Sequence, residues 1–243
     1  MDAELSNPIT GCIDINPLEG YTFRGSAMKR VAPEMPTHEE LAIGFANTVA
    51  WRLRDPIEDR AASPEAMLKW MLAAALLDHA AFARISTRWR KSPQEAHDFL
   101  KEAVTLREAI YRLFLAPVRG KAADANDVEI LNRQLARSLR GVKLAASREA
   151  LSWSGEDGSA AVLLVPIAWS AASLLMGPRA QRIKQCQDER GCGWVFIDES
   201  RAQNRRWCSM GDCGNLAKSR RHFDRKAEQA AASAGLPSRA ANG

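Results

Sequence analysis

The sequence lacks the features that mark secreted, membrane-spanning and repetitive proteins. Its first 20 residues carry four acids and no apolar stretch of the kind that a secretory signal needs, so we expect a cytoplasmic protein. No internal repeat or low-complexity tract interrupts the 243 residues. With 46% hydrophobic and 26% charged residues, the composition is that of a globular protein.

Catalytic motifs are also missing. The four histidines are scattered along the chain: His38, His79, His97 and His222. No His-Glu-x-x-His pair, nucleophile elbow or phosphate-binding loop is present. The acidic pairs Glu39/Glu40 and Asp124/Asp127 stand at expected helix starts, where acids favour the helix dipole. We therefore expect no enzyme, and an activity that uses a cavity of the helical region is the alternative.

Charged residues are absent from positions 158–178, about the length that a membrane helix needs. This segment is rich in alanine rather than leucine, and it contains Pro166, Ser170 and Ser173. These residues favour a buried core helix over a membrane span. Pro166 is expected either to kink that helix or to lie in its first turn.

Apolar residues recur at helical spacing through most of residues 37–178. Capping boxes, which join a serine or threonine to a glutamate three residues later, begin two of the expected helices at Thr37 and Ser92. Two short strands, 143–145 and 150–154, separate the last two helices. The expected helices run over residues 37–55, 64–75, 79–90 and 93–114, from a point after Gly120 to 139, and over 159–176.

A polar pair interrupts the first expected helix, whose apolar stripe has four-residue spacing: Leu41, Phe45 and Val49. The pair, Asn47 and Thr48, is expected either to line a small-ligand pocket with Trp51 or to point to solvent. Core packing is the alternative role for Trp51, as it is for Trp70 and Trp169.

Cysteine is scarce but concentrated. Four of the five cysteines fall within 28 residues as two close pairs: Cys186, Cys192, Cys208 and Cys213. Because thiols stay reduced in the cytoplasm, two such pairs can converge as thiolates on one tetrahedral zinc ion. We expect a structural Zn²⁺ site, with redox-active or unliganded thiols as the alternative. Cys12 stands alone and is interpreted as an incidental thiol.

The residues around the cysteines indicate the shape of this zinc module. Residues 194–197 predict a strand, 198–200 a turn and 216–232 a helix that follows the second cysteine pair. A second knuckle that leads into a helix is the treble-clef arrangement. A domain of about 45 residues buries too little apolar surface to fold alone, so metal binding would supply much of its folding free energy. The fold class that we expect is mainly α with a small β-hairpin, plus a C-terminal treble-clef-like zinc finger.

Net positive charge is confined to the cysteine region. Residues 182–226 hold 11 Lys and Arg against 6 Asp and Glu, a net charge of +5 that equals the net charge of the whole chain. Such a field suits a polyanion, and a solvated basic face is the alternative. Arg201 is set apart, because bracing Asp198 inside the hairpin is another role for it. The side chains expected to bind nucleic acid are Arg205, Arg206, Lys218, Arg220, Arg221, Arg225 and Lys226.

The cysteine region closely resembles the CGNR zinc finger of bacterial regulators. The resemblance rests on Cys-Gly-Trp-Val-Phe-Ile-Asp-Glu-Ser-Arg at 192–201, on Arg-Arg-Trp-Cys-Ser-Met-Gly-Asp-Cys-Gly-Asn at 205–215, and on the basic residues at 218–221. The arginine that gives this finger its name is replaced by Leu216. If that arginine touches phosphate in the family, this chain makes one phosphate contact fewer, although its basic neighbours remain.

In that family the finger follows an ABATE domain, a mainly helical unit with a small strand element. Residues 41–48, 106–109 and 166–168 resemble it. The resemblance implies a stress-related transcription regulator whose finger binds DNA and whose helical domain senses a ligand. The expected organisation is a flexible tail at 1–36, an ABATE-like domain at 37–178, the finger at 179–232 and a second tail at 233–243.

The expected function is therefore a cytoplasmic, DNA-binding transcription regulator that does not enter a membrane. Its helical domain is expected to sense an unidentified small-molecule effector or to form a homodimer, because a single basic finger binds weakly. A zinc-stabilised protein-interaction module and an RNA-binding protein are the alternatives.

Overall fold

The computed structural model of the chain describes residues 38–137, 142–146, 151–155 and 159–233. Within these ranges it contains seven α-helices and three two-stranded antiparallel sheets. The expected mainly helical fold class is confirmed. Cys12, Thr37 and the two expected tails lie outside the described residues, apart from Ser233, which ends the last helix.

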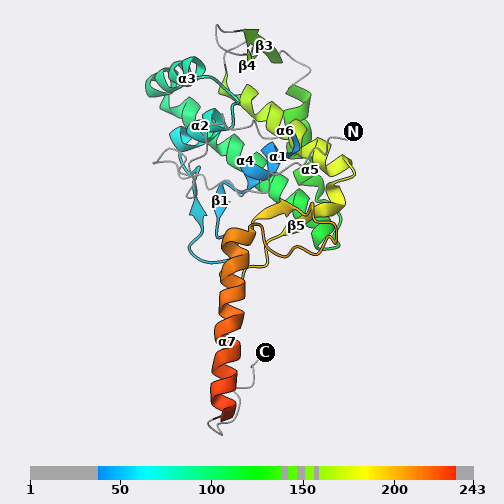
Figure 1. Ribbon diagram of the computed structural model, residues 1–243. Helices are drawn as coiled ribbons and strands as arrows, with labels where there is room; N and C mark the ends of the chain where they lie inside the picture. The colour runs from blue at the N-terminus through cyan, green and yellow to red at the C-terminus, as the bar shows by residue number, and fades with distance from the viewer. Residues whose placement is uncertain (1–37, 138–141, 147–150, 156–158, 234–243) are drawn as a thin grey trace, which may run out of the picture.

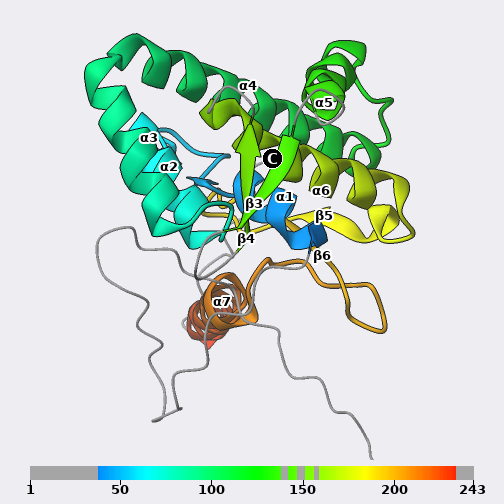
Figure 2. The ribbon, with the colours of Figure 1, turned by 90° about the horizontal axis from the view of Figure 1, so that it is seen from above.

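Six helices build a body from which the seventh projects as a long rod (Figure 1). The central helix is α4, which contacts α1, α2, α3, α5 and α6 and runs across the body when this is seen from above (Figure 2). Its inner face is buried through Phe99, Ala103, Leu106, Ile110 and Phe114. The six helices are α1 (His38–Ala46), α2 (Pro64–Ala73), α3 (His79–Lys91), α4 (Pro93–Val118), α5 (Ala125–Arg137) and α6 (Leu164–Met176).

Helix α1 ends earlier than the sequence predicts. The chain leaves it at Ala46, and Val49–Ala50 forms strand β1, which pairs with β2 (Glu58–Asp59). The expected extension of this helix to residue 55 is therefore wrong. Asn47 and Thr48 explain the end: the first side chain binds a distant strand, and the hydroxyl of the second donates to the Phe45 carbonyl oxygen at 2.8 Å.

Two expected helix starts have different outcomes. Ser63 caps α2, because its hydroxyl oxygen accepts a hydrogen bond from the Ala66 N–H at 3.1 Å. Ser92, by contrast, makes no side-chain cap bond at the start of α4. The capping box expected there is wrong, because the Glu95 carboxylate accepts from Arg88 of the preceding helix at 2.8 Å instead.

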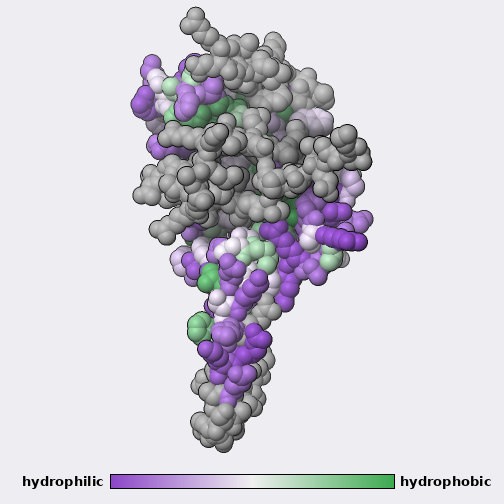
Figure 3. Space-filling model, in the orientation of Figure 1, coloured by the Kyte–Doolittle hydropathy of each residue, from purple (hydrophilic) through white to green (hydrophobic). Residues whose placement is uncertain are grey.

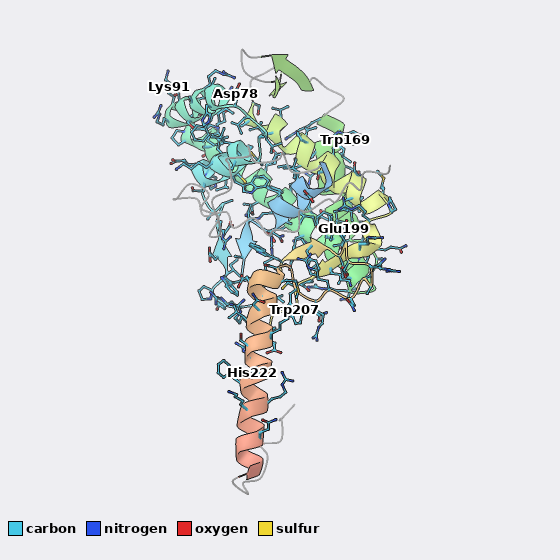
Figure 4. The ribbon with its side chains drawn as sticks, in the orientation of Figure 1. Asp78, Lys91, Trp169, Glu199, Trp207 and His222 are labelled. Atoms are coloured by element: carbon cyan, nitrogen blue, oxygen red, sulfur yellow. The ribbon has the colours of Figure 1, made fainter. Side chains whose placement is uncertain are left out.

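The uncharged segment forms helix α6, preceded by a short 3₁₀ helix at Ala160–Leu163. Pro166 lies in the first turn of α6, one of its two expected positions, and most of the helix is buried against α1 and α5. Among the described residues, no helix is both long and apolar enough to cross a membrane. Trp70 is buried as expected of a core residue, whereas Trp169 on α6 is 44% exposed (Figure 4).

Two small sheets complete the chain. Strands β3 (Val142–Ala146) and β4 (Leu151–Gly155) form the expected hairpin between α5 and α6, with Leu144 opposite Trp153. Strands β5 (Ile183–Gln185) and β6 (Val195–Ile197) pair beyond a short 3₁₀ helix at Ala180–Arg182. A π-helical turn, Met210–Gly214, then leads into α7 (Asn215–Ser233).

The C-terminal region shares its core with the helical body. Ile183 of β5 and Val195 of β6 are buried in the same apolar cluster as the inner faces of α1, α4 and α6. Both strands contact α4. The two regions are therefore packed together, and only α7 extends away from the shared core (Figures 1 and 2).

Candidate metal centre and nucleic-acid interface

The four clustered cysteines converge from two short loops. Cys186 and Cys192 bound the first knuckle, between β5 and β6, and Cys208 and Cys213 bound the second, which runs into the π-helical turn before α7. All four side chains are buried, and their sulfur atoms lie within 4.8 Å of one another. The Sγ–Sγ distance is 3.7 Å from Cys192 to Cys208 and 3.8 Å from Cys208 to Cys213.

These distances fit one zinc ion. A tetrahedron with zinc–sulfur bonds of about 2.3 Å has sulfur–sulfur edges of about 3.8 Å, whereas a disulfide is about 2.05 Å long. Hydrogen bonds from the other three thiols lower the pKa of Cys186. The pKa of Cys213 is raised, chiefly by its hydrogen bonds with Cys186 and Cys192. One thiolate therefore disfavours the next unless a cation lies among them. The expected ligands are confirmed: the chain binds a structural Zn²⁺ ion.

Two charged side chains of the first knuckle, Arg190 and Asp188, lie beside the zinc ligands. The Arg190 guanidinium lies 3.8 Å from the sulfur of Cys213. It also donates hydrogen bonds of 2.5–3.1 Å to the Asp188 carboxylate. Burial opposes ionisation of Asp188, but the Arg190 guanidinium holds the pKa of that carboxyl below its ordinary value. A cation beside a thiolate stabilises it and fixes its direction, as outer partners of metal ligands do.

The first knuckle is hydrogen-bonded to a loop of the helical body. The backbone N–H groups of Arg52 and Leu53 donate to the carbonyl oxygens of Cys192 and Gly191 at 3.1 and 3.0 Å. Gly191 and Gly193 both have positive φ, and a Cβ on Gly193 would lie 2.7 Å from the Cγ of Leu53. Only glycine permits this backbone and this close approach. The first knuckle and residues 52–54 therefore pack closely against each other.

The polar pair expected to line a ligand pocket lies at this junction. The Asn47 amide donates to the Val195 carbonyl oxygen at 2.8 Å and accepts from the Val195 N–H at 3.0 Å. The Thr48 hydroxyl donates to Phe45 and accepts from Arg107 at 3.1 Å. Trp51 packs against the cysteine cluster. The structure thus gives these three residues a role in joining the body to the metal region, and the ligand pocket expected there stays a prediction.

Helix α4 supplies three side chains that the sequence did not single out for this junction. Arg52 is held by the Glu108 carboxylate at 2.7 and 3.2 Å and lies 3.8 Å above the ring of Tyr111. The Tyr111 hydroxyl donates to the Gly193 carbonyl oxygen at 2.7 Å. Arg107, almost fully buried, holds Asp59 of β2 with bonds of 2.7 and 2.9 Å. The Leu-Arg-Glu-Ala run at 106–109 was the available signal, but it gave no direction for these side chains.

Comparison with protein families matches residues 39–178 to ABATE, described as "Putative stress-induced transcription regulator", and residues 182–226 to the CGNR zinc finger. The chain belongs to the ABATE family. Its C-terminal region is a CGNR zinc finger, as the resemblance implied. No curated protein matches the chain by sequence.

Within the CGNR finger, Asp198 is fully buried and anchors the loop between the two knuckles. Its carboxylate accepts from the Lys184 ammonium at 2.6 Å, from the Ser200 hydroxyl at 2.5 Å and from the Arg205 N–H at 2.8 Å. Burial opposes ionisation, but these donors, Lys184 foremost, hold the pKa of Asp198 well below its ordinary value. Lys184 therefore takes the bracing role considered for Arg201, whose side chain is exposed.

The basic residues just before the second knuckle differ in direction. Arg205 turns inward: its guanidinium donates to the carbonyl oxygens of Trp207 and Cys208 and lies 5.0 Å above the ring of Phe196. Arg206 is exposed, bonded to Gln187 at 2.8 Å and placed over Trp207, which lies at the base of α7 (Figure 4). Arg205 is thus a brace of the metal site, and Arg206 remains on the surface.

Helix α7 carries the other expected nucleic-acid residues. Lys218, Arg220, Arg225 and Lys226 lie on it with surface-accessible side chains, and Arg220 contacts Glu189 of the first knuckle at 3.2 Å. The side chain of Arg221 lies outside the described residues. Figure 3 shows hydrophilic side chains along the upper part of this helix, with apolar side chains among them.

Apolar residues share the surface of α7. Leu216, at the position of the family's arginine, is 45% exposed, and Phe223 is 68% exposed. The two are seven residues apart, so they lie on one face of the helix. The basic surface of the CGNR finger therefore borders an apolar strip.

Proposed function

We propose that the chain is a cytoplasmic, DNA-binding transcription regulator without catalytic activity, in which α7 contacts DNA. The observation that carries this proposal is the set of lysines and arginines on the surface of a helix that starts at the zinc site and extends away from the body (Figure 1). A polyanion can reach such a helix from several sides. The family description as a transcription regulator supports the same assignment.

The geometry of α7 suits a DNA groove. A single α-helix fits the major groove, where arginine can read guanine while lysine neutralises phosphate. Lys218 and Arg225 are seven residues apart and so share one face. The zinc ion fixes the residues that precede the helix, so the start of α7 is held in place before DNA arrives. In this proposal the ABATE domain senses a small molecule or dimerises, because one finger alone binds weakly.

The proposal predicts salt-dependent binding to duplex DNA. We expect the zinc-loaded chain to bind a labelled duplex of random sequence at low salt, because phosphate contacts are independent of sequence. The logarithm of the association constant should fall linearly with the logarithm of salt concentration, by about 0.9 for each phosphate neutralised. Fluorescence anisotropy across a salt series measures this slope.

A matched pair of variants identifies the surface. Lys218→Gln with Arg225→Gln should make the slope shallower by about 1.8, the value for two phosphate contacts. Arg133→Gln, an exposed change on α5, should leave the slope as it is. No affinity at low salt, or affinity that salt does not weaken, would reject the proposal.

A protein-interaction module is the second candidate, and the exposed Leu216 and Phe223 favour it. An apolar strip beside basic residues suits an acidic, partly apolar protein surface. Binding to a purified protein partner, with no binding to duplex DNA or RNA, would support this candidate. Competition between RNA and duplex DNA separates the remaining alternative, an RNA-binding protein.

A further inference from the structure

The loop of residues 51–57 lies on the ABATE side of the metal site and is exposed over most of its length. Leu53, Arg54 and Ile57 all face solvent. The two N–H bonds from Arg52 and Leu53 to the first knuckle hold the loop in a defined position beside the zinc ligands. The loop is therefore an ordered surface of the helical body at the finger.

The two arginines of this loop are used differently. Arg52 points inward, with a side chain only 8% exposed that is paired with Glu108. Arg54 points outward, and its guanidinium lies 4.3 Å above the ring of Trp51. Across the described ranges, no carboxylate pairs with Arg54. Stacking restrains the guanidinium while its N–H donors stay available, which is the state that suits bidentate binding of phosphate.

The first knuckle connects this loop to α7. A Cβ on Gly191 would lie 3.0 Å from the Cβ of Arg54, so the loop backbone packs directly on the knuckle. Two residues earlier, Glu189 contacts Arg220 in the second turn of α7 at 3.2 Å. The loop that carries Arg54 therefore packs on the same knuckle that the basic helix contacts.

We propose that Arg54 makes a second, phosphate-directed contact with DNA, supplied by the ABATE domain rather than by the finger. The proposal rests on the proposed DNA-binding function. It implies that the DNA-binding surface spans both family units, which the rigid junction of loop and knuckle keeps in register. Arg54 would then offer DNA a positive charge near the finger, where Leu216 offers none.

The test compares salt slopes of the full-length, zinc-loaded chain on the same random-sequence duplex. We expect Arg54→Gln to make the slope shallower by about 0.9, the value for one phosphate. Arg54→Lys, which keeps the charge but loses the planar guanidinium, should give a slope between those of the wild type and Arg54→Gln. Lys91→Gln, an exposed change at the far end of α3 (Figure 4), should have no effect. Zinc content should be the same in all four proteins.

The outcomes separate this inference from the proposed function. A wild-type slope in Arg54→Gln, with a shallower slope in the Lys218/Arg225 variant, overturns the inference and leaves the proposed function in place. If the wild-type chain does not bind DNA at all, both fail.

Discussion

Replacing Cys208 with serine is expected to release zinc and unfold the CGNR finger. Structural zinc contributes about 10–16 kcal/mol to folding in small finger peptides at neutral pH, as much as the whole stability of an ordinary domain. The finger has little apolar core of its own beyond the four cysteines, Phe196 and the tryptophans packed on them. Without the metal, few contacts remain to hold either knuckle in its folded conformation. Metal analysis of the purified variant measures the loss.

The same variant should also weaken the helical body. Ile183 and Val195 contribute to the shared core, and the first knuckle binds residues 51–53, so an unfolded finger removes these contacts from α1 and α4. We expect most of the helical circular-dichroism signal to persist at low temperature, with a lower melting temperature. Cys12→Ser is the matched control, because four other cysteines already complete a tetrahedral ligand set, and it should retain full zinc content. Full zinc content in Cys208→Ser would show that the site is misassigned.

Replacing Arg107 with alanine is expected to cost about 3–5 kcal/mol of folding free energy, the usual effect of breaking a buried ion pair from one side. The change leaves Asp59 without the two bonds of 2.7 and 2.9 Å that hold it, and it removes a donor from Thr48. Since Asp59 and Thr48 position β1 and β2, the loop that docks on the finger loses its support. Urea unfolding followed by circular dichroism gives the change in free energy.

Arg133→Ala is the control for this measurement. Arg133 is an exposed arginine on α5, and surface changes of this kind usually alter stability by less than about 0.5 kcal/mol. If Arg107→Ala also changes the free energy of unfolding by no more than this amount, the role of Arg107 as the support of the junction is contradicted.

The metal ligands were predictable because their chemistry is local. Two close pairs of cysteines are the usual ligand pattern of a structural zinc site, and the structure places all four sulfur atoms together. The buried face of α4 was equally predictable, because helical periodicity alone determines which residues share a face. In both cases the signal lies within a few turns of chain.

The junction between the two units was not predictable, because its contacts are remote in sequence. Asn47 ends α1 by binding Val195, 148 residues further along the chain, and no local pattern announces that partner. Arg205 and Arg206 contribute equally to a charge count, yet one turns toward carbonyl oxygens at the metal site and the other toward solvent. The sequence gives the charge of each side chain, but only the fold shows which way that side chain points.

The residues of the expected ligand pocket illustrate the same limit. A polar pair in an apolar stretch indicates that buried partners exist, and Asn47 and Thr48 do have buried partners. Those partners belong to the protein itself: one is the backbone of β6 and the other is Arg107. The sequence identified an unusual position, and the structure shows that its residues connect the helical body to the finger.

The most direct test of whether this protein regulates transcription by binding DNA through α7 is a map of the genomic sites that it occupies in cells. The wild-type chain would be compared with the Lys218→Gln/Arg225→Gln variant, after both have been shown to carry zinc and to fold. We predict discrete sites for the wild-type chain and loss of most of them in the variant. Absence of enriched sites in the wild-type map, or an unchanged set of sites in the variant, would contradict the proposed function.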